Sequence, residues 1–301
     1  MASAREMRLR IRSVKSISQV TRALQAVSAT RVRRAQQQVL ATRPYASKAW
    51  QVLTHIALQP GGKNLHPLLI RRATVKNVLV ILISGDRGLA GAYNTNIMRS
   101  TLNAVREMSA PVHFATVGRK GWEMIRRRGQ TIAHVFHKLP DHPAFADVSA
   151  VGRLAVEEFL DGRADEVYLA YTDFVNLVKQ TPTIKKLLPL EIVGEEHLVM
   201  GEYSRPQAGA PATYIYEPDQ ASLLAEIIPR FTALQVYQAV LEAQASEHAA
   251  RMVAMQNATD NAQELAVSLQ LVYNRARQTS ITSEMLDIAG GAEALAKATV
   301  A

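Results

Sequence analysis

Residues 219–289 read DQASLLAEIIPRFTALQVYQAVLEAQASEHAARMVAMQNATDNAQELAVSLQLVYNRARQTSITSEMLDIA. The stretch has no glycine and a single proline, Pro229, so little in it interrupts a helix. Apolar and small residues recur at steps of three and four, which places them on one stripe of that helix. At 1.5 Å per residue the helix spans about 100 Å, against roughly 30 Å for a small domain. It must therefore pack along another long helix or be held by other proteins.

The beginning of the chain supplies a second long helix. Residues 1–59 also lack glycine and contain only Pro44. Their apolar residues recur at a mean step below 3.6, which favours a left-handed supercoil with a partner helix. The residues of this stripe are Met7, Ile11, Val14, Ile17, Val20, Leu24, Val27, Ala35 and Val39. We therefore predict a two-helix rod made from residues 1–60 and 212–301, with the apolar stripe of the first helix buried.

The middle of the chain differs from both ends, because all fifteen glycines lie between Gly61 and Gly291. Proline and glycine at 60–62 end the first helix. Runs rich in Val, Leu and Ile then alternate with helical segments, which is typical of a largely parallel sheet covered by helices. The expected strands are 75–84, 112–117, 131–136 and 167–171, and the expected helices are 94–108, 119–128 and 145–160. Residues 181–190 contain two prolines and suit an edge strand. Residues 73–200 are thus predicted to form an α/β domain inserted in the rod.

Charge and cysteine usage restrict the function. Residues 1–48 carry eleven Lys and Arg against the single acid Glu6, so the whole of the net charge of +9 arises there. The basic helix is either a solvated face or the face of an acidic partner. An Arg-rich start also resembles a mitochondrial transit peptide, but the pattern continues without a break into the periodic helix. The chain has no cysteine, which excludes disulfides, thiolate catalysis and cysteine-based zinc sites.

No segment is expected to cross a membrane. The longest purely apolar run, residues 78–83, is far shorter than the roughly 20 residues that a membrane helix needs. Attachment to a membrane is therefore expected only through partners. Nucleic acid is not expected as a partner, because the basic helix has no aromatic residue before Tyr45 and its arginines alternate with an apolar stripe.

The loop at residues 84–92, SGDRGLAGA, lies between a predicted strand and a helix, where phosphate-binding loops occur. Its glycines have the spacing G-x-x-G-x-x-G, which is neither the dinucleotide pattern nor the P-loop pattern. The loop is therefore predicted to be a tight structural turn, without a bound cofactor.

Catalytic and metal-binding patterns are not recognisable. His134, His137 and His142 lack the spacing of metal ligands and are expected at the surface or in turns. The acidic pairs at 157–158 and 195–196 are expected to be exposed. We predict that the chain by itself performs no catalysis and binds no metal.

One motif near the C-terminus is far more specific. Residues 281–294 read ITSEMLDIAGGAEA, which is similar to the signature of the gamma subunit of the rotary F-type ATP synthase. The resemblance extends to SEHAARMVAM at 246–255, ATDNA at 258–262 and LVYNRARQ at 271–278. It also includes TRAL at 21–24, RPY at 43–45 and DRGL at 86–89, so that it covers essentially the whole chain.

The resemblance implies a fold and a function. The fold would be an antiparallel coiled coil of the two ends with a Rossmann-like α/β domain inserted between them. The function would be that of a non-catalytic central-stalk rotor of the bacterial type, which couples proton flow through the c-ring to ATP synthesis or hydrolysis. One copy would turn inside a ring of three alpha and three beta subunits and would bind the epsilon subunit. It would be a peripheral protein at the cytoplasmic face of the cell membrane.

The resemblance also implies roles for single residues. Those matching contacts with the beta subunits are Leu24, Arg251, Gln278 and Thr282. The apolar bearing tip would include Ile281, Leu286 and Ile288. Contacts with the c-ring and epsilon would come from Tyr214, Tyr216 and Glu217. Pro229 departs from the family pattern and is expected to kink the first turns of its helix.

Two other classes of function stay open from the sequence. A coiled-coil scaffold without rotation would self-associate through its long stripe. A nucleotide-binding α/β enzyme would bind nucleotide in its middle domain, although the glycine spacing predicts none.

Overall fold

The computed structural model describes residues 4–57, 66–191 and 220–300. Predictions for the helix end at 60–62, the acidic pair at 195–196, and Tyr214, Tyr216 and Glu217 lie outside the described residues. The chain divides into two compact units, which we describe separately. Met1–Val27 and Val253–Ala301 form the first unit, and Ser28–Met252 form the second.

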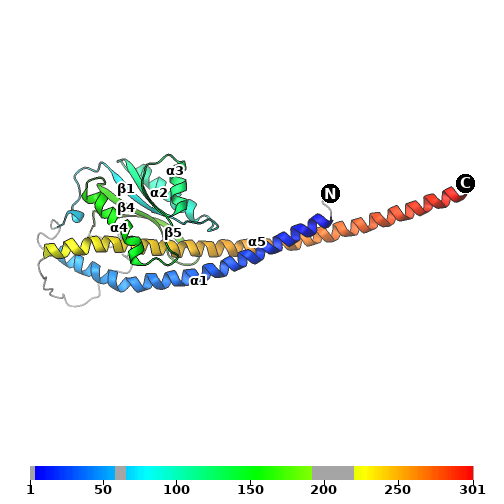
Figure 1. The fold of residues 1–301 in the computed structure, drawn as a ribbon, viewed down its shortest axis with the longest axis horizontal. Coiled ribbons are helices and arrows are strands. Elements are labelled where there is room, and N and C mark those ends of the chain that lie inside the picture. Colours follow the sequence, from blue (N-terminus) through cyan, green and yellow to red (C-terminus); the bar gives the residue numbers. More distant parts are fainter. Residues whose placement is uncertain (1–3, 58–65, 192–219, 301) are drawn as a thin grey trace. The chain divides into compact units, whose positions relative to one another are not determined.

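Two helices account for both ends of the chain, as predicted. Helix α1 spans Ala4–Ala57 with 54 residues, and α5 spans Gln220–Val300 with 81 residues (Figure 1). Helix α5 runs without a break through Pro229 and through the glycine pair at 290–291. The proline therefore does not end the helix, and the helix is longer than the glycine-free stretch that predicted it.

The second unit contains a five-stranded sheet with the order β3-β2-β1-β4-β5. The strands are β1 (Val78–Ile83), β2 (Val112–Val117), β3 (Ile132–Phe136), β4 (Glu166–Phe174) and β5 (Gln180–Leu188). The first four are parallel, and β5 pairs antiparallel with β4 at the edge. The predicted α/β fold is confirmed, including the proline-containing edge strand.

Helices cover both faces of this sheet (Figure 1). They are α2 (Tyr93–Glu107), α3 (Arg119–Arg127) and α4 (Phe145–Leu160), and a short 3₁₀ turn, η2, spans Pro67–Leu69. Strand β1 is buried on both sides because its side chains alternate between two cores. Val80 and Leu82 pack with α2 and α3, whereas Leu79 and Ile81 pack with α4 and with the parts of α1 and α5 in the same unit.

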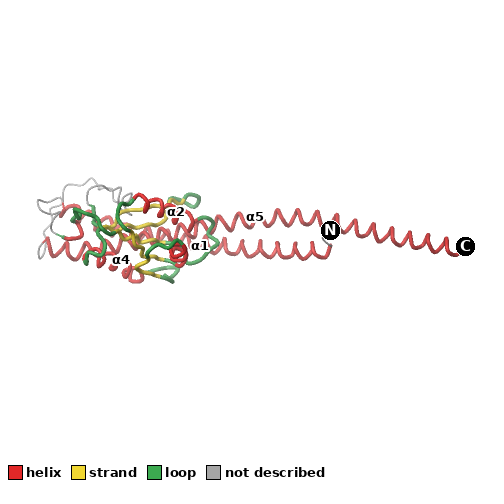
Figure 2. Tube along the Cα trace, turned by 90° about the horizontal axis from the view of Figure 1, so that it is seen from above, coloured by secondary structure: helices red, strands yellow, loops and turns green. Residues whose placement is uncertain are grey.

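The two long helices run antiparallel in each unit. In the second unit, Thr42 donates a hydrogen bond to Gln238 at 2.6 Å, and Trp50, further along α1, stacks on Phe231, further back along α5. In the first unit, the hydroxyls of Thr21 and Thr259 lie 2.6 Å apart. Figure 2 shows α1 and α5 side by side.

The prediction that the whole apolar stripe of α1 is buried is wrong for part of the first unit. Met7 and Ile11 are buried, but Ile17 is 52%, Val20 57% and Val27 49% exposed. A single partner helix covers only a narrow seam, so apolar positions that flank the seam remain accessible. These side chains are available to a further partner.

The prediction that the acids at 157–158 are both exposed is wrong for Glu158, which is buried. Glu158 lies on the same face of α4 as Val151 and Ala155, the face that packs on the sheet. Its carboxylate accepts a 2.8 Å hydrogen bond from Arg163 and lies 3.2 Å from His134. Arg163 lies in the turn after α4 and His134 lies on β3. Because these partners are outside α4, the pattern of residues along the helix does not indicate that Glu158 is buried.

Candidate functional site

The C-terminal part of α5 has no partner helix among the described residues. Ala4, where α1 begins, lies seventeen residues before Thr21, so the register set by Thr21 and Thr259 places it opposite residue 276. Every side chain from 277 to 292 is exposed. These sixteen residues form about 24 Å of single helix within the first unit.

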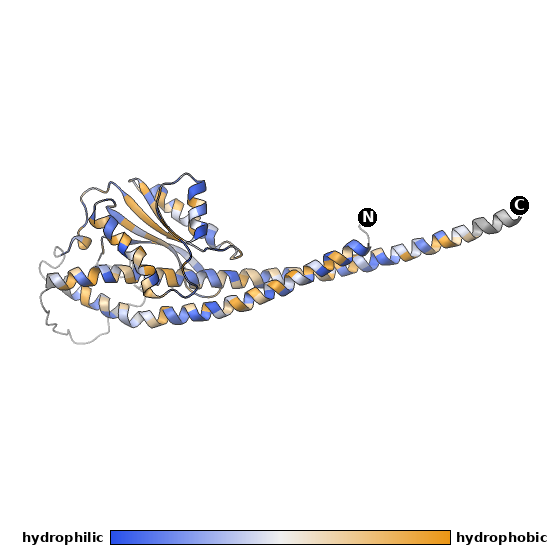
Figure 3. Cartoon of the chain, in the orientation of Figure 1, coloured by the Kyte–Doolittle hydropathy of each residue, from blue (hydrophilic) through white to orange (hydrophobic). Residues whose placement is uncertain are grey.

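This single helix carries apolar side chains that water disfavours. Ile281 is 41%, Met285 66%, Leu286 67% and Ile288 73% exposed. Ile281, Met285 and Ile288 are spaced by four and three, which puts them on one face, and Figure 3 shows apolar residues interspersed along this end of α5. Burial of such a side chain stabilises by about 1.5–3 kcal/mol. The segment is therefore suited to an apolar surrounding supplied by other proteins.

The structure brings five of the residues implied by the resemblance onto this one segment. They are Gln278, Ile281, Thr282, Leu286 and Ile288, all of them exposed. The Thr282 hydroxyl donates to the carbonyl oxygen of Gln278 at 3.0 Å, inside the helix. Gln278 is thus exposed on the same stretch of helix as the apolar residues.

A basic groove lies where α1 and α5 pack side by side in the first unit. Arg8, Arg12 and Lys15 line it on α1, and Gln270 and Tyr273 line it on α5. No acidic side chain lines this groove among the described residues. Leu24 lies further along α1 and is half-buried, next to the exposed Val20 and Val27. This part of α1 thus combines positive charge with accessible apolar side chains.

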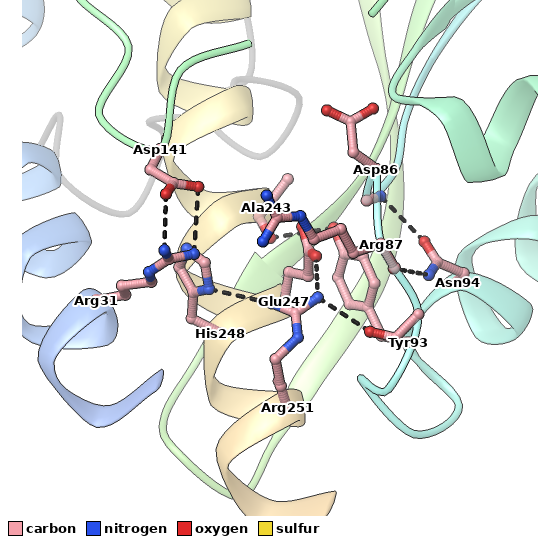
Figure 4. Close-up of polar contacts among 12 residues, drawn as sticks. Arg31, Asp86, Arg87, Tyr93, Asn94, Asp141, Ala243, Glu247, His248 and Arg251 are labelled. Carbon is pink, nitrogen blue, oxygen red and sulfur yellow. Dashed lines mark hydrogen bonds and ion pairs between the residues drawn. The ribbon is translucent and has the colours of Figure 1, made fainter. Parts of the chain in front are cut away.

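Arg251 belongs to the second unit and is largely engaged within the chain (Figure 4). Its guanidinium pairs with Glu247 and donates to the carbonyl oxygen of Gly88 at 3.3 Å. Only 12% of the side chain is exposed. Burial raises the pKa of Glu247, and the charge of Arg251 acts against that rise. Burial, together with Arg251, lowers the pKa of His248 to about 4, so this histidine is neutral at neutral pH.

The glycine loop at 84–92 lies directly on α5. A Cβ at Gly85 would lie 2.8 Å from the carboxyl group of Glu247, so the backbone of the loop and this side chain are closely packed. The hydroxyl of Tyr93 donates to the carbonyl oxygen of Ala243 at 3.0 Å. Asp86 accepts a 2.8 Å hydrogen bond from the amide of Arg119, the first residue of α3. Contacts with α3 and α5 thus hold the loop in place, which supports a structural role for the glycines.

An ion pair that the sequence did not predict lies beside this cluster. Arg31 of α1 pairs with Asp141, in the loop between β3 and α4, at 2.8 Å (Figure 4). The contact joins residues 110 positions apart, and no spacing rule could have found it. Within the part of the chain that the structure describes, no group of three or more His, Asp or Glu side chains could hold a metal ion. In the same residues, no helix is both long and apolar enough to span a bilayer.

Comparisons with known proteins cover the full chain. A family model described as ATP synthase matches residues 3–295. The chain is 44% identical over 300 residues to the ATP synthase gamma chain of Roseiflexus sp. (strain RS-1), an alignment that covers 99% of this chain and 100% of that one. It is also 44% identical over 297 residues to the ATP synthase gamma chain of Dehalococcoides mccartyi (strain CBDB1), covering 98% and 100%.

Solved structures support the same fold at lower identity. The rotor of the Euglena gracilis mitochondrial ATP synthase matches with a TM-score of 0.64 and 20% identity, covering 92% of this chain and 98% of that one. The central stalk and c-ring structure from Tetrahymena thermophila mitochondria matches with a TM-score of 0.59 and 22% identity, covering 79% and 99%. On the family model and the full-length identity, the chain belongs to the ATP synthase gamma chain family.

Proposed function

We propose that this chain is the central-stalk rotor of an F-type ATP synthase. It couples proton flow through the membrane c-ring to ATP synthesis or hydrolysis by rotating inside the ring of alpha and beta subunits. The observation that carries this function is the exposed, apolar end of α5 at residues 277–292, in a chain related over its full length to gamma chains. The exposed apolar side chains of this helix end are suited to burial inside a ring of other subunits.

The rotor drives three sites by breaking their symmetry. A single shaft inside a ring with three-fold pseudosymmetry contacts each beta subunit differently. A contact shifts a conformational equilibrium only through its different affinity for the two states, so each catalytic site takes the state that its own contact favours. Rotation then exchanges the three states among the sites.

The chain itself transmits force and carries out no chemistry. The glycine spacing of the loop at 84–92 matches neither the dinucleotide pattern nor the P-loop pattern, which supports this assignment. One copy acts in each complex, with three alpha and three beta subunits, the epsilon subunit and the c-ring. The complex places it at the cytoplasmic face of the cell membrane, to which only its partners attach it.

The contacts with partners divide along the chain. Ile281, Leu286 and Ile288 turn in an apolar bearing, and Gln278 and Thr282 contact the beta subunits beside it. Leu24 and the basic groove of α1 face acidic loops of beta, as their charge and exposure favour. Arg251 contacts beta through the small part of its side chain that its ion pair with Glu247 leaves exposed. The foot at Tyr214, Tyr216 and Glu217 meets the c-ring and epsilon.

Light scattering on the purified chain, with and without alpha and beta subunits, tests this function. We expect a complex that contains one copy of the chain and hydrolyses ATP. A dimer of the chain that is indifferent to alpha and beta would contradict the proposal and favour a coiled-coil scaffold. Replacing Ile288 by Asp should weaken the complex, whereas replacing the exposed, polar Thr279 by Asp should not.

Single arginine substitutions in the basic helix should have small effects. Exposed ion pairs contribute about 0–1 kcal/mol each, so steric contact and the stiffness of the helix pair carry most of the torque. Replacing any one arginine between Arg5 and Arg34 with alanine is expected to leave most coupled ATP synthesis intact. The measurement is ATP synthesis in vesicles driven by a proton gradient. Near-complete loss from one such change, with assembly normal, would overturn this view.

A further inference from the structure

A buried carboxyl group lies where α1, α5 and the sheet meet in the second unit. Glu242 of α5 is 3% exposed. Its Oε1 accepts a 2.9 Å hydrogen bond from the side-chain amide of Gln238, and Gln238 in turn accepts a 2.6 Å hydrogen bond from Thr42 of α1. The second oxygen of Glu242, Oε2, is buried and receives no hydrogen bond from a donor among the described residues.

Helix α1 also carries a buried hydrogen-bond acceptor near Glu242. Thr42 pairs with Gln238, so the antiparallel register places Gln38, one turn earlier on α1, opposite Glu242, one turn later on α5. The side-chain oxygen Oε1 of Gln38 is also buried and without a donor in the described part of the chain. Buried polar atoms are nearly always hydrogen-bonded. A proton on Glu242 Oε2 would supply a donor to the acceptors that face it, Gln38 Oε1 on α1 and the carboxylate of Asp173 on β4.

Neighbouring charges on the sheet act in opposite directions. Burial is the main influence and raises the pKa of Glu242 well above its usual range. Asp173 at the end of β4 raises it further, through its negative charge and through a hydrogen bond between the two carboxyl groups. Lys185 of β5 acts the other way, as does the hydrogen bond from Gln238. On α1, the facing residues Gln38 and Thr42 carry no charge.

We propose that Glu242 is protonated in the folded protein at neutral pH. Its proton links α5 to α1 and β4 by hydrogen bonding between their side chains. The site goes beyond the proposed rotor function, because it concerns how the α/β domain is fixed to the shaft. On folding, the carboxyl group takes its proton from the solvent. Its pKa is higher in the folded than in the unfolded chain, so the stabilisation is complete below the unfolded pKa and is lost as pH rises through the folded pKa.

Thermal unfolding of the full chain between pH 5 and pH 9 tests the proposal. Glu242→Gln keeps the shape and supplies a permanent N–H donor, so it should raise the unfolding midpoint by about 2–4 °C at pH 8 and give no gain at pH 5. Glu226→Gln, at an exposed position on the same helix, is the control and should show no pH-dependent gain. A Glu242→Gln variant that is equally or less stable than the parent at pH 8 would overturn the proposal.

A second measurement does not depend on any variant folding. The side-chain carboxyl carbons of glutamate are labelled with ¹³C in the unmodified chain, and their NMR shifts are followed with pH. The Glu242 signal is assigned through its backbone connectivities, because burial also raises the pKa of Glu247. We expect the Glu242 signal to remain at the protonated position up to neutral pH. If all glutamate signals titrate in the ordinary acidic range, Glu242 is ionised and the proposal is wrong.

Discussion

Replacing Trp50 with alanine is expected to lower the free energy of unfolding of the second unit by about 3–5 kcal/mol. Trp50 of α1 is 4% exposed and stacks on Phe231 of α5, which is 2% exposed, with ring centroids 5.7 Å apart. The fully buried Leu53 follows one turn later on α1. Removing the indole leaves a cavity that this tightly packed seam cannot close.

Denaturant titration of the purified chain measures this cost. Tyr45→Ala is the matched control, because this aromatic residue of the same helix is 62% exposed and should cost less than about 1 kcal/mol. In the assembled enzyme, Trp50→Ala should reduce ATP synthesis more than ATP hydrolysis. Weaker packing between α1 and α5 makes the helix pair less stiff, so that it transmits less torque. Equal costs for the two variants would show that the helix pair is not held by this contact.

Replacing Asp165 with alanine is expected to destabilise the α/β domain by about 3–5 kcal/mol, as the loss of one partner from a buried ion pair does. Asp165 precedes β4 and is buried. Its carboxylate accepts hydrogen bonds from Arg72 at 2.6 Å and from the backbone amides of Lys76 at 2.6 Å and Asn77 at 3.0 Å. The substitution leaves the arginine and both amides without their acceptor.

We also expect the ionisation of Asp165 to make the stability of the folded chain depend on pH. Burial opposes ionisation of Asp165, but the two backbone amides and Arg72 outweigh it and lower the pKa of the carboxyl group. A lowered pKa gives stability that is present above the unfolded pKa and is lost as pH falls through the folded pKa. The parent chain should therefore lose stability below about pH 4, and Asp165→Ala should lose less over that range.

Asp161→Ala is the control for this site. Asp161 is 56% exposed and pairs only with Arg163 among the described residues, so its loss should cost less than about 1 kcal/mol. Thermal or denaturant unfolding at pH 7 and pH 3.5 compares the variants. If Asp165→Ala were as stable as Asp161→Ala at pH 7, the carboxylate would not be holding the start of β4.

Much of the fold could be predicted from the sequence because it depends on local patterns. Glycine-free stretches with helical spacing predicted α1 and α5, and the run at 78–83 predicted the central strand. The residues of the α5 tip could be grouped in advance because a helix places near neighbours in sequence close together in space. Their contacts with other subunits stay predictions.

The features that the sequence did not indicate depend on residues far apart in the chain. The burial of Glu158 of α4 depends on two polar partners outside the helix, Arg163 in the following turn and His134 on β3. The environment of Glu242 requires α1 and β4 as well as its own helix. The exposure of Val20 reflects how narrow a seam one partner helix covers. Helical spacing shows that a stripe exists, but it does not show how many partners cover it.

Direct observation of rotation tests the central claim most directly. The chain has no cysteine, so a single cysteine in place of Val178, which is 85% exposed in the β4–β5 turn, gives a unique site on this chain for a visible probe. The complex is fixed to a surface through its beta subunits and supplied with ATP. We predict that the probe turns in one direction and pauses three times in each turn, once for each catalytic site. A probe that stays still while ATP is hydrolysed at the normal rate would contradict the rotor function.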